Sequence, residues 1–243
     1  MVDFRERFDG TGTGFEYPMT LRVWNPFTGD EVALEELQAG ARATHFEERF
    51  LIVAEPEKGI HFFDLRNSSA ITHRVFELPL TYGLDSLHAA RFQNQLVVFS
   101  NGEADGKNVR SPLLYDPIRI SRISAPVNGF VYGFDIKTGE LLWDKPGQLY
   151  NMTFPTIQPT DSPFMLLYQV HERTKLASCA MIDIRYGSFV FAEHLLQADT
   201  DGFSMRLLPL KQQIVANVGM KGLLISFSDS TRAPQPVFSF RAR

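Results

Sequence analysis

The chain has 243 residues, of which 44% are hydrophobic and 21% charged, and its formal net charge is −4. These shares are typical of a soluble globular protein. The slight acidic excess argues against a nucleic-acid partner, because nucleic-acid binders usually carry a basic patch. No run approaches the roughly 18 apolar residues that a membrane-spanning helix needs, so we expect no membrane span in this chain.

The N-terminal residues 1–20 are rich in Gly and Thr, are poor in strand signals and lack the apolar core of a signal peptide. We expect this segment to be irregular and the following residues, 21–240, to form strands. The clearest helical pattern, Glu31–Ala41, is too short to set the fold class. Elsewhere, short runs of β-branched and aromatic residues alternate with Gly, Asn, Asp and Pro, which predicts an all-β protein.

The best local pattern is Val131–Trp143, which predicts a strand, a tight turn and a returning strand. Asp135 can cap the turn by accepting backbone N–H bonds, and Gly139 supplies the positive φ that such a turn needs. Trp143 then falls on the returning strand, where its large ring can fill the space between neighbouring sheets.

The same frame recurs along the chain. Asn25 and Gly29 match it near the N-terminus, and Asp183 and Gly187 match it further on, whereas Asp64 belongs to a weaker copy without the glycine. Spacings of 39 residues (Asn25 to Asp64) and 48 residues (Asp135 to Asp183) are those of propeller blades. The residues assigned a structural role in the repeat are Asn25, Gly29, Asp64, Asp135, Thr138, Gly139, Trp143, Asp183 and Gly187.

Another strand precedes each hairpin, at Phe50–Ala54, Gln95–Phe99 and Phe164–Tyr168, and a fifth unit follows at Gln213–Phe227. Four strands in this order form a β-meander, and such units pack radially in a β-propeller. The chain therefore predicts four to five four-stranded antiparallel blades. We expect the C-terminal part of a larger seven- or eight-bladed ring, with a closed five-bladed ring as the alternative.

The stretch from Gly133 resembles the repeat of pyrroloquinoline-quinone-type (PQQ-like) propellers, Ala-x-Asp-x-x-Thr-Gly-x-x-x-Trp. Gly133 replaces the alanine, whereas Asp135, Thr138, Gly139 and Trp143 match. Only this copy is full, and the partial copies loosely cover residues 20–230. A WD40 propeller is an alternative, but no Gly-His and Trp-Asp pair is placed as that family requires.

This resemblance implies two functions. Many PQQ-like propellers bind no quinone and act as assembly factors at bacterial envelopes, which implies a non-catalytic binding or scaffolding module for a protein or ligand, outside the cytoplasm. The alternative is a fragment of a quinone-dependent (PQQ) oxidoreductase. Many such enzymes stack a vicinal cysteine pair on the quinone, but this chain has a single cysteine, Cys179. We therefore expect no cofactor and no catalytic residue. A propeller hydrolase or lyase remains a third possibility.

Two further patterns contain residue types that bind metals. Gln197–Gly202 resembles the start of a calcium loop, but the following residues do not supply the remaining ligands, so a turn between blades is expected. His61, Asp64 and His73 are close in sequence. In a strand, however, His61 and Phe63 share one face while Asp64 points to the other. We therefore expect no metal site.

The longest gap between predicted strands is Ser100–Asn128, an insertion of charged residues around an apolar and aromatic centre. Long loops of this kind in compact domains are usually functional or disordered. One interpretation is a neutral, tolerated loop; the other is a protein-binding surface, since Tyr and Arg are common anchors. The candidate partner-binding residues are Leu114, Tyr115, Arg119 and Arg122. If the chain is a segment of a ring, its exposed strand edges also predict self-association.

Overall fold

The computed structural model describes residues 2–3, 19–24, 31–47, 49–65, 72–81, 83–102, 124–155, 158–171, 174–197, 203–218, 221–227 and 238–242. The described residues form antiparallel β-sheets, and the helical structure among them is one short turn, η1 (Pro209–Lys211). The fold is therefore all-β, as the sequence predicts. No helix in these ranges is long and apolar enough to cross a membrane.

The first sheet has three strands, β1 (Val2–Asp3), β2 (Met19–Trp24) and β3 (Glu31–Leu37), in the order β1-β2-β3. The expected helical pattern at Glu31–Ala41 is wrong, because Glu31 to Leu37 pair with β2 as an antiparallel strand. A short helical pattern is a weak preference that strand pairing overrides. The expectation of an irregular segment at residues 1–20 is also wrong where it can be checked, because Val2 and Asp3 pair with β2 and Met19 and Thr20 lie in β2 itself. Residues 1 and 4–18 lie outside the described residues.

The second sheet is a four-stranded meander of β4 (Arg42–Phe46), β5 (Phe50–Glu55), β6 (Gly59–Asp64) and β7 (Thr72–Phe76). All six residues of β5 are buried. A strand that is buried on both faces reads as a continuous apolar run, and β5 has this pattern except for its last residue, Glu55.

The third sheet has seven strands and covers two of the predicted units. Its strands are β8 (Leu84–Phe92), β9 (Gln95–Gly102), β10 (Ser124–Asp135), β11 (Gly147–Pro155), β12 (Phe164–Val170), β13 (Leu176–Asp183) and β14 (Ser188–Gln197). The strands follow one another in sequence order across the sheet. The two units are joined at one pair of residues, Thr153 of β11 and Tyr168 of β12.

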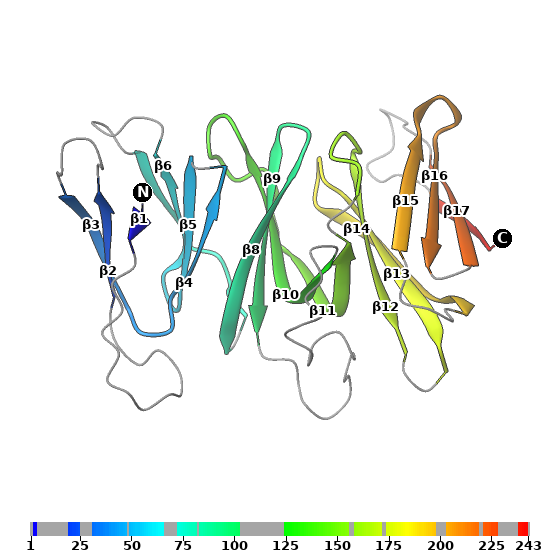
Figure 1. Ribbon diagram of the computed structural model, residues 1–243, viewed down its shortest axis with the longest axis horizontal. Coiled ribbons are helices and arrows are strands. Elements are labelled where there is room, and N and C mark those ends of the chain that lie inside the picture. The colour runs from blue at the N-terminus through cyan, green and yellow to red at the C-terminus, as the bar shows by residue number, and fades with distance from the viewer. Residues whose placement is uncertain are drawn as a thin grey trace.

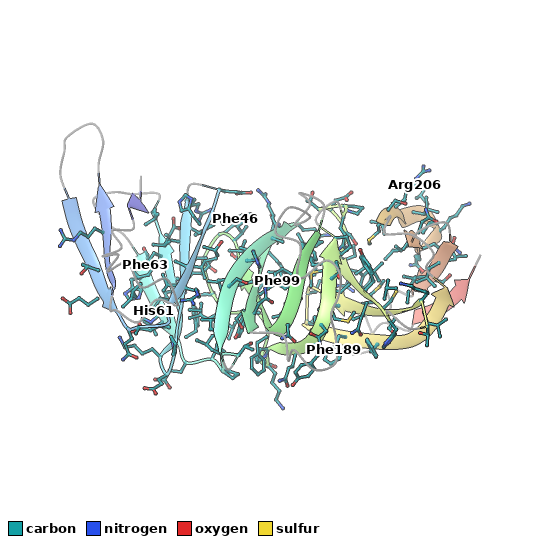
Figure 2. All side chains as sticks on the ribbon, turned by 60° about the horizontal axis from the view of Figure 1, so that its bottom comes forward. Phe46, His61, Phe63, Phe99, Phe189 and Arg206 are labelled. Carbon is teal, nitrogen blue, oxygen red and sulfur yellow. The ribbon has the colours of Figure 1, made fainter. Side chains whose placement is uncertain are left out.

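The fourth sheet is again a four-stranded meander, of β15 (Phe203–Leu208), β16 (Gln213–Val218), β17 (Lys221–Phe227) and β18 (Phe238–Ala242). Figure 1 shows the sheets following one another along the long axis of the molecule, with the two termini at opposite ends. The described sheets do not close into a ring in either view (Figures 1 and 2), so the alternative of a closed five-bladed ring is wrong for this structure.

The core lies between the sheets as separate apolar layers. One layer packs the β5–β6 face against β8, β9 and β10, through residues such as Phe62, Val98 and Phe134. The next packs the other face of β9 and β10 against β12 and β13 around Trp143. A third packs β12 and β13 against β16 and β17. Each fully buried Val, Leu, Ile or Phe contributes about 1.5–3 kcal/mol, so these layers hold the sheets together. Antiparallel meanders packed face to face in sequence order form an architecture of the β-propeller type.

Candidate functional site

The turn after β10 has the geometry that its sequence suggests. The Asp135 carboxylate accepts hydrogen bonds from the backbone N–H groups of Lys137 and Thr138, both at 2.8 Å, and from the Thr138 hydroxyl at 3.2 Å. Burial raises the pKa of the Asp135 carboxyl, but the hydrogen bonds from Thr138 and Lys137 outweigh it and leave this pKa below its usual value. Gly139 closes the turn with a φ of +69°.

Each of two repeat glycines lies against a ring from the preceding unit. A Cβ on Gly139 would lie 2.9 Å from the Phe62 ring, and a Cβ on Gly187 would lie 2.6 Å from the Trp143 ring. Gly187 also has a φ of +69°. These glycines thus combine a positive φ with a close approach to an aromatic ring, and both requirements select glycine.

Trp143 is 1% exposed and lies between two units. Its indole N–H donates a 2.7 Å hydrogen bond to the Ile184 carbonyl of the next turn. The expectation that Trp143 lies on a returning strand is wrong: the return is a single bridge between Phe134 and Leu141, and β11 begins only at Gly147. The Trp143 ring lies against Gly133 and Gly187, neither of which could carry a Cβ without meeting it.

The other repeat aspartates bind arginines. Asp183 is fully buried and accepts hydrogen bonds from the Arg185 backbone N–H at 3.0 Å and from its guanidinium at 3.0 and 2.8 Å. Asp64 accepts two hydrogen bonds from Arg49, which also donates to the Lys137 carbonyl of the next unit. Asn25 and Gly29 lie outside the described residues.

The predicted insertion lies between β9 and β10. Its candidate binding residues, Leu114, Tyr115, Arg119 and Arg122, lie outside the described residues. At its base, the Asn128 backbone N–H donates to the Asn101 side chain at 3.0 Å. Nearby, the buried Tyr132 hydroxyl lies 3.0 Å from the Ser100 hydroxyl and donates to the Pro79 carbonyl at 2.6 Å. Burial raises the pKa of Tyr132, so this phenol is neutral and acts as a structural hydrogen-bonding group.

Exposed aromatic rings lie on the edge strand of the seven-stranded sheet. Phe189 and Phe191, two residues apart on β14, share a face and are 48% and 44% exposed. We call this pair the β14 aromatic patch. Tyr186, in the turn just before β14, is 66% exposed. Figure 2 shows Phe189 at the rim of the molecule. Elsewhere among the described residues, most phenylalanines pack between sheets, so this pair is a candidate contact surface.

A polar group that sequence reasoning missed lies on the second sheet. Glu55 is fully buried, and its Oε1 accepts a hydrogen bond from the Gln38 N–H at 2.9 Å and lies 3.0 Å from the Lys58 ammonium. Its Oε2 lies 3.1 Å from Nε2 of His61, which is 1% exposed. These two atoms are close but are not aligned for a hydrogen bond.

His61 also meets a second histidine. Its Nδ1 lies 3.2 Å from Nε2 of His73, an exposed residue of β7 whose ring stacks on Phe63 at 4.2 Å. Figure 2 labels His61 and Phe63 on this sheet. Asp64, in contrast, binds Arg49, as expected from the opposite face of the strand. The signal that could have found this group is Glu55, a charged residue at the end of an apolar run. The β5–β6 hairpin brings Glu55 close to His61.

A depression of about 510 Å³ opens beside this group, lined by Glu57, Lys58, His61, Val75, Glu77 and Leu78. Within the described ranges, no group of three or more His, Cys, Asp and Glu residues is arranged to hold a metal ion. Cys179 is fully buried, and burial raises the pKa of its thiol to about 12, so this group is an unreactive apolar filler.

Comparisons with known proteins identify no family. No protein-family model matches the chain, and no curated protein matches it. Solved structures do show similarity to the chain, and three of them illustrate how distant it is. TolB from Acinetobacter baumannii is 14% identical, with a TM-score of 0.29; the match covers 86% of this chain and 45% of TolB.

The other two are fungal. Hsv2 from Kluyveromyces lactis is 9% identical, with a TM-score of 0.29, over 98% of this chain and 84% of that one. The WD40 domain of SCAP from fission yeast is 8% identical, with a TM-score of 0.27, over 93% and 58%. The chain thus spans about half the length of two of the three structures. Because these TM-scores are low, we infer nothing about this protein from the three structures. The fold is assigned from the sheets described above.

Proposed function

We propose that this chain is a non-catalytic β-propeller module of the PQQ-like kind that binds a protein partner. The observation that carries the proposal is the β14 aromatic patch, Phe189 and Phe191, exposed on an edge strand. Aromatic rings that remain half-exposed on a rigid sheet commonly anchor protein–protein contacts, because they bury a large area at a low cost in side-chain entropy. Tyr186 extends the aromatic surface along the chain.

The PQQ-like part of the proposal is supported by the turn after β10. Asp135, Thr138 and Gly139 form a closed hydrogen-bonded turn, and Trp143 docks on the next unit. In this proposal the repeat residues stabilise the turns and the contacts between units, and the exposed edge strand β14 binds the partner. The insertion residues Leu114, Tyr115, Arg119 and Arg122 remain a second proposed contact region.

The test is site-specific photo-crosslinking in the cells that make the protein. A photoreactive phenylalanine analogue is placed at position 189, and a matched control at Leu210, which is fully exposed on η1. We expect one discrete protein to be crosslinked from position 189 and not from position 210. The double variant Phe189→Ser/Phe191→Ser should then lose this protein in co-purification while keeping its circular dichroism spectrum. Identical products from both positions would contradict the proposal.

The role of the insertion is tested separately. Residues 103–123 are replaced by a short Gly/Ser linker, which keeps β9 and β10, and folding is checked by circular dichroism. If the insertion contacts the same partner, co-purification falls while crosslinking from position 189 is weakened. A folded variant that retains the partner fully would end the insertion proposal and leave the β14 aromatic patch in place. A quinone absorption band in the purified protein would instead support the oxidoreductase alternative.

A further inference from the structure

The two histidine nitrogens of the second sheet lie at a separation that suits two ligands of one metal ion. Nδ1 of His61 and Nε2 of His73 are 3.2 Å apart. Zinc–nitrogen bonds are about 2.0–2.1 Å long, and tetrahedral angles then place two nitrogens roughly 3.3 Å apart. Imidazole nitrogens suit Zn²⁺, Cu²⁺ and Ni²⁺.

Glu55 is placed to orient one of the two ligands. Its buried Oε2 lies 3.1 Å from the other ring nitrogen of His61, Nε2. Histidines that bind metals usually donate this second N–H to a carboxylate, which fixes the tautomer and makes the binding nitrogen more basic. A metal at Nδ1 requires the proton on Nε2, and a small turn of the ring or of the carboxylate then aligns this N–H with Glu55 Oε2, which has no aligned hydrogen bond in the present geometry.

The charge around the pair favours a cation. The depression at His61 is lined by the carboxylates of Glu57 and Glu77 and by one ammonium, Lys58, which is already paired with Glu55. Among the described residues around His61, and counting Glu55, three carboxylates therefore oppose one ammonium. His61 is buried within the sheet, whereas His73 is exposed on the neighbouring strand, so an ion can enter from the solvent side.

We propose that His61 and His73 bind one divalent ion of the Zn²⁺, Ni²⁺ or Cu²⁺ class, with Glu55 as the carboxylate that positions His61. The chain supplies two nitrogens, and the remaining ligand positions take water or a side chain of a bound protein. This site was not expected from the sequence. It is independent of the β14 aromatic patch, which lies on another sheet, so either proposal can fail without the other.

The test titrates Cu²⁺ and Zn²⁺ into the metal-stripped full chain. His73→Gln removes an exposed ligand and should leave the fold intact, and His45→Gln removes an exposed histidine of β4 as the matched control. With Cu²⁺, we expect the wild type and His45→Gln to show a paramagnetic resonance spectrum with hyperfine splitting from two imidazole nitrogens. His73→Gln should lose this pattern, and its affinity should fall at least about 10-fold.

A second readout measures the effect of Zn²⁺ on the melting temperature. Saturating Zn²⁺ should raise the Tm of the wild type and of His45→Gln by several degrees, but not that of His73→Gln. Glu55→Gln should keep the two-nitrogen spectrum and lose about 10–100-fold in affinity, as a positioning residue does. If no ion binds at about 100 μM, or if His73→Gln binds as tightly as the wild type, the histidines are only a hydrogen-bonded pair and the proposal is overturned.

Discussion

The interior sheets and the C-terminal sheet differ in how many of their faces are apolar. In β9, the residues Leu96 and Val98 face one apolar layer and Val97 and Phe99 face the next, and all four are buried. In β16, the neighbouring residues alternate: Ile214 and Ala216 are buried against β12 and β13, whereas Val215 and Asn217 face the other side, where Val215 is partly buried and Asn217 is exposed.

The difference shows that the pattern of apolar residues along a strand indicates whether its sheet is covered on one face or on both. A strand between two sheets needs apolar residues at every position, and a strand with one solvent-facing side needs them at every second position. Across the second face of the C-terminal sheet lie polar residues, Ser204, Arg206, Gln213, Asn217 and Ser226, with Leu208, Val215 and Leu224 among them. This face is built for contact with water or with a polar surface.

The largest expected effect comes from an interior contact between units. Trp143→Ala removes a ring that is 1% exposed and its hydrogen bond to Ile184, so it should lower the free energy of unfolding by about 3–5 kcal/mol. Leu224→Ala, on the second face of the C-terminal sheet, should cost only about 1 kcal/mol. Urea melts measure both. A loss below about 1 kcal/mol for Trp143→Ala would remove the basis for its role between units.

A matched pair of valines tests the two kinds of face directly. Val98→Thr buries a hydroxyl between two sheets, where Val98 is fully buried, and should cost about 1–3 kcal/mol. Val215→Thr makes the same change on the partly exposed face and should stay within about 0.5 kcal/mol. Chemical denaturation of both variants gives the comparison, and equal losses would show that the second face is as dry as the interior.

Substitutions at two glycines with similar φ can distinguish the cost of backbone strain from the cost of a steric clash. Gly139 and Gly83 have φ values of +69° and +63°, but a Cβ at Gly139 meets the Phe62 ring whereas nothing lies within 4 Å of one at Gly83. Because asparagine tolerates this conformation, Gly83→Asn should cost less than about 1 kcal/mol and Gly139→Asn about 1–3 kcal/mol. Thermal melts decide between them. Gly139→Val should be worse than Gly139→Asn, since a β-branched residue adds backbone strain.

The smallest expected effect is the pH dependence of the Asp135 turn. The pKa of this carboxyl is lowered in the folded state, so its stabilising contribution is present above the unfolded pKa and is lost as the pH falls through the folded pKa. Asp135→Asn should therefore destabilise the protein slightly at pH 7, and the difference from the wild type should shrink below about pH 4. Urea melts at a series of pH values measure it. A difference that grows on acidification would contradict this assignment.

The all-β fold could be predicted from the sequence, because apolar strands and glycine-containing turns are determined mainly by residues close together in the chain. The runs at Phe50–Ala54 and Phe164–Tyr168 lie within β5 and β12. The helical pattern at Glu31–Ala41 failed because pairing with β2 outweighs a weak local preference. The position of the Trp143 ring between sheets was predicted, but the returning strand was not found, since the return is a single bridge between Phe134 and Leu141.

The candidate sites were less accessible from the sequence. The approach of His61 to His73 depends on the diagonal register of β6 and β7, where His61 pairs with Val75 and His73 pairs with Phe63. Glu55 reaches His61 only because the hairpin is tight, with Glu55 opposite Gly59. The exposure of the β14 aromatic patch could not be predicted, because a phenylalanine in a strand is expected to be buried unless the neighbouring sheets are known.

The link between Thr153 and Tyr168 makes the middle of the molecule a single continuous sheet. In arrays of separate units, each unit can open alone, because only side-chain contacts join it to its neighbours. Here one backbone pair and the apolar layer around Trp143 both join the two units, so we expect the opening of either unit to disturb the other. The amides of β10 and β12 should therefore exchange with solvent deuterium at a common rate, as one cooperative block, while those of β5 and β16 follow their own sheets.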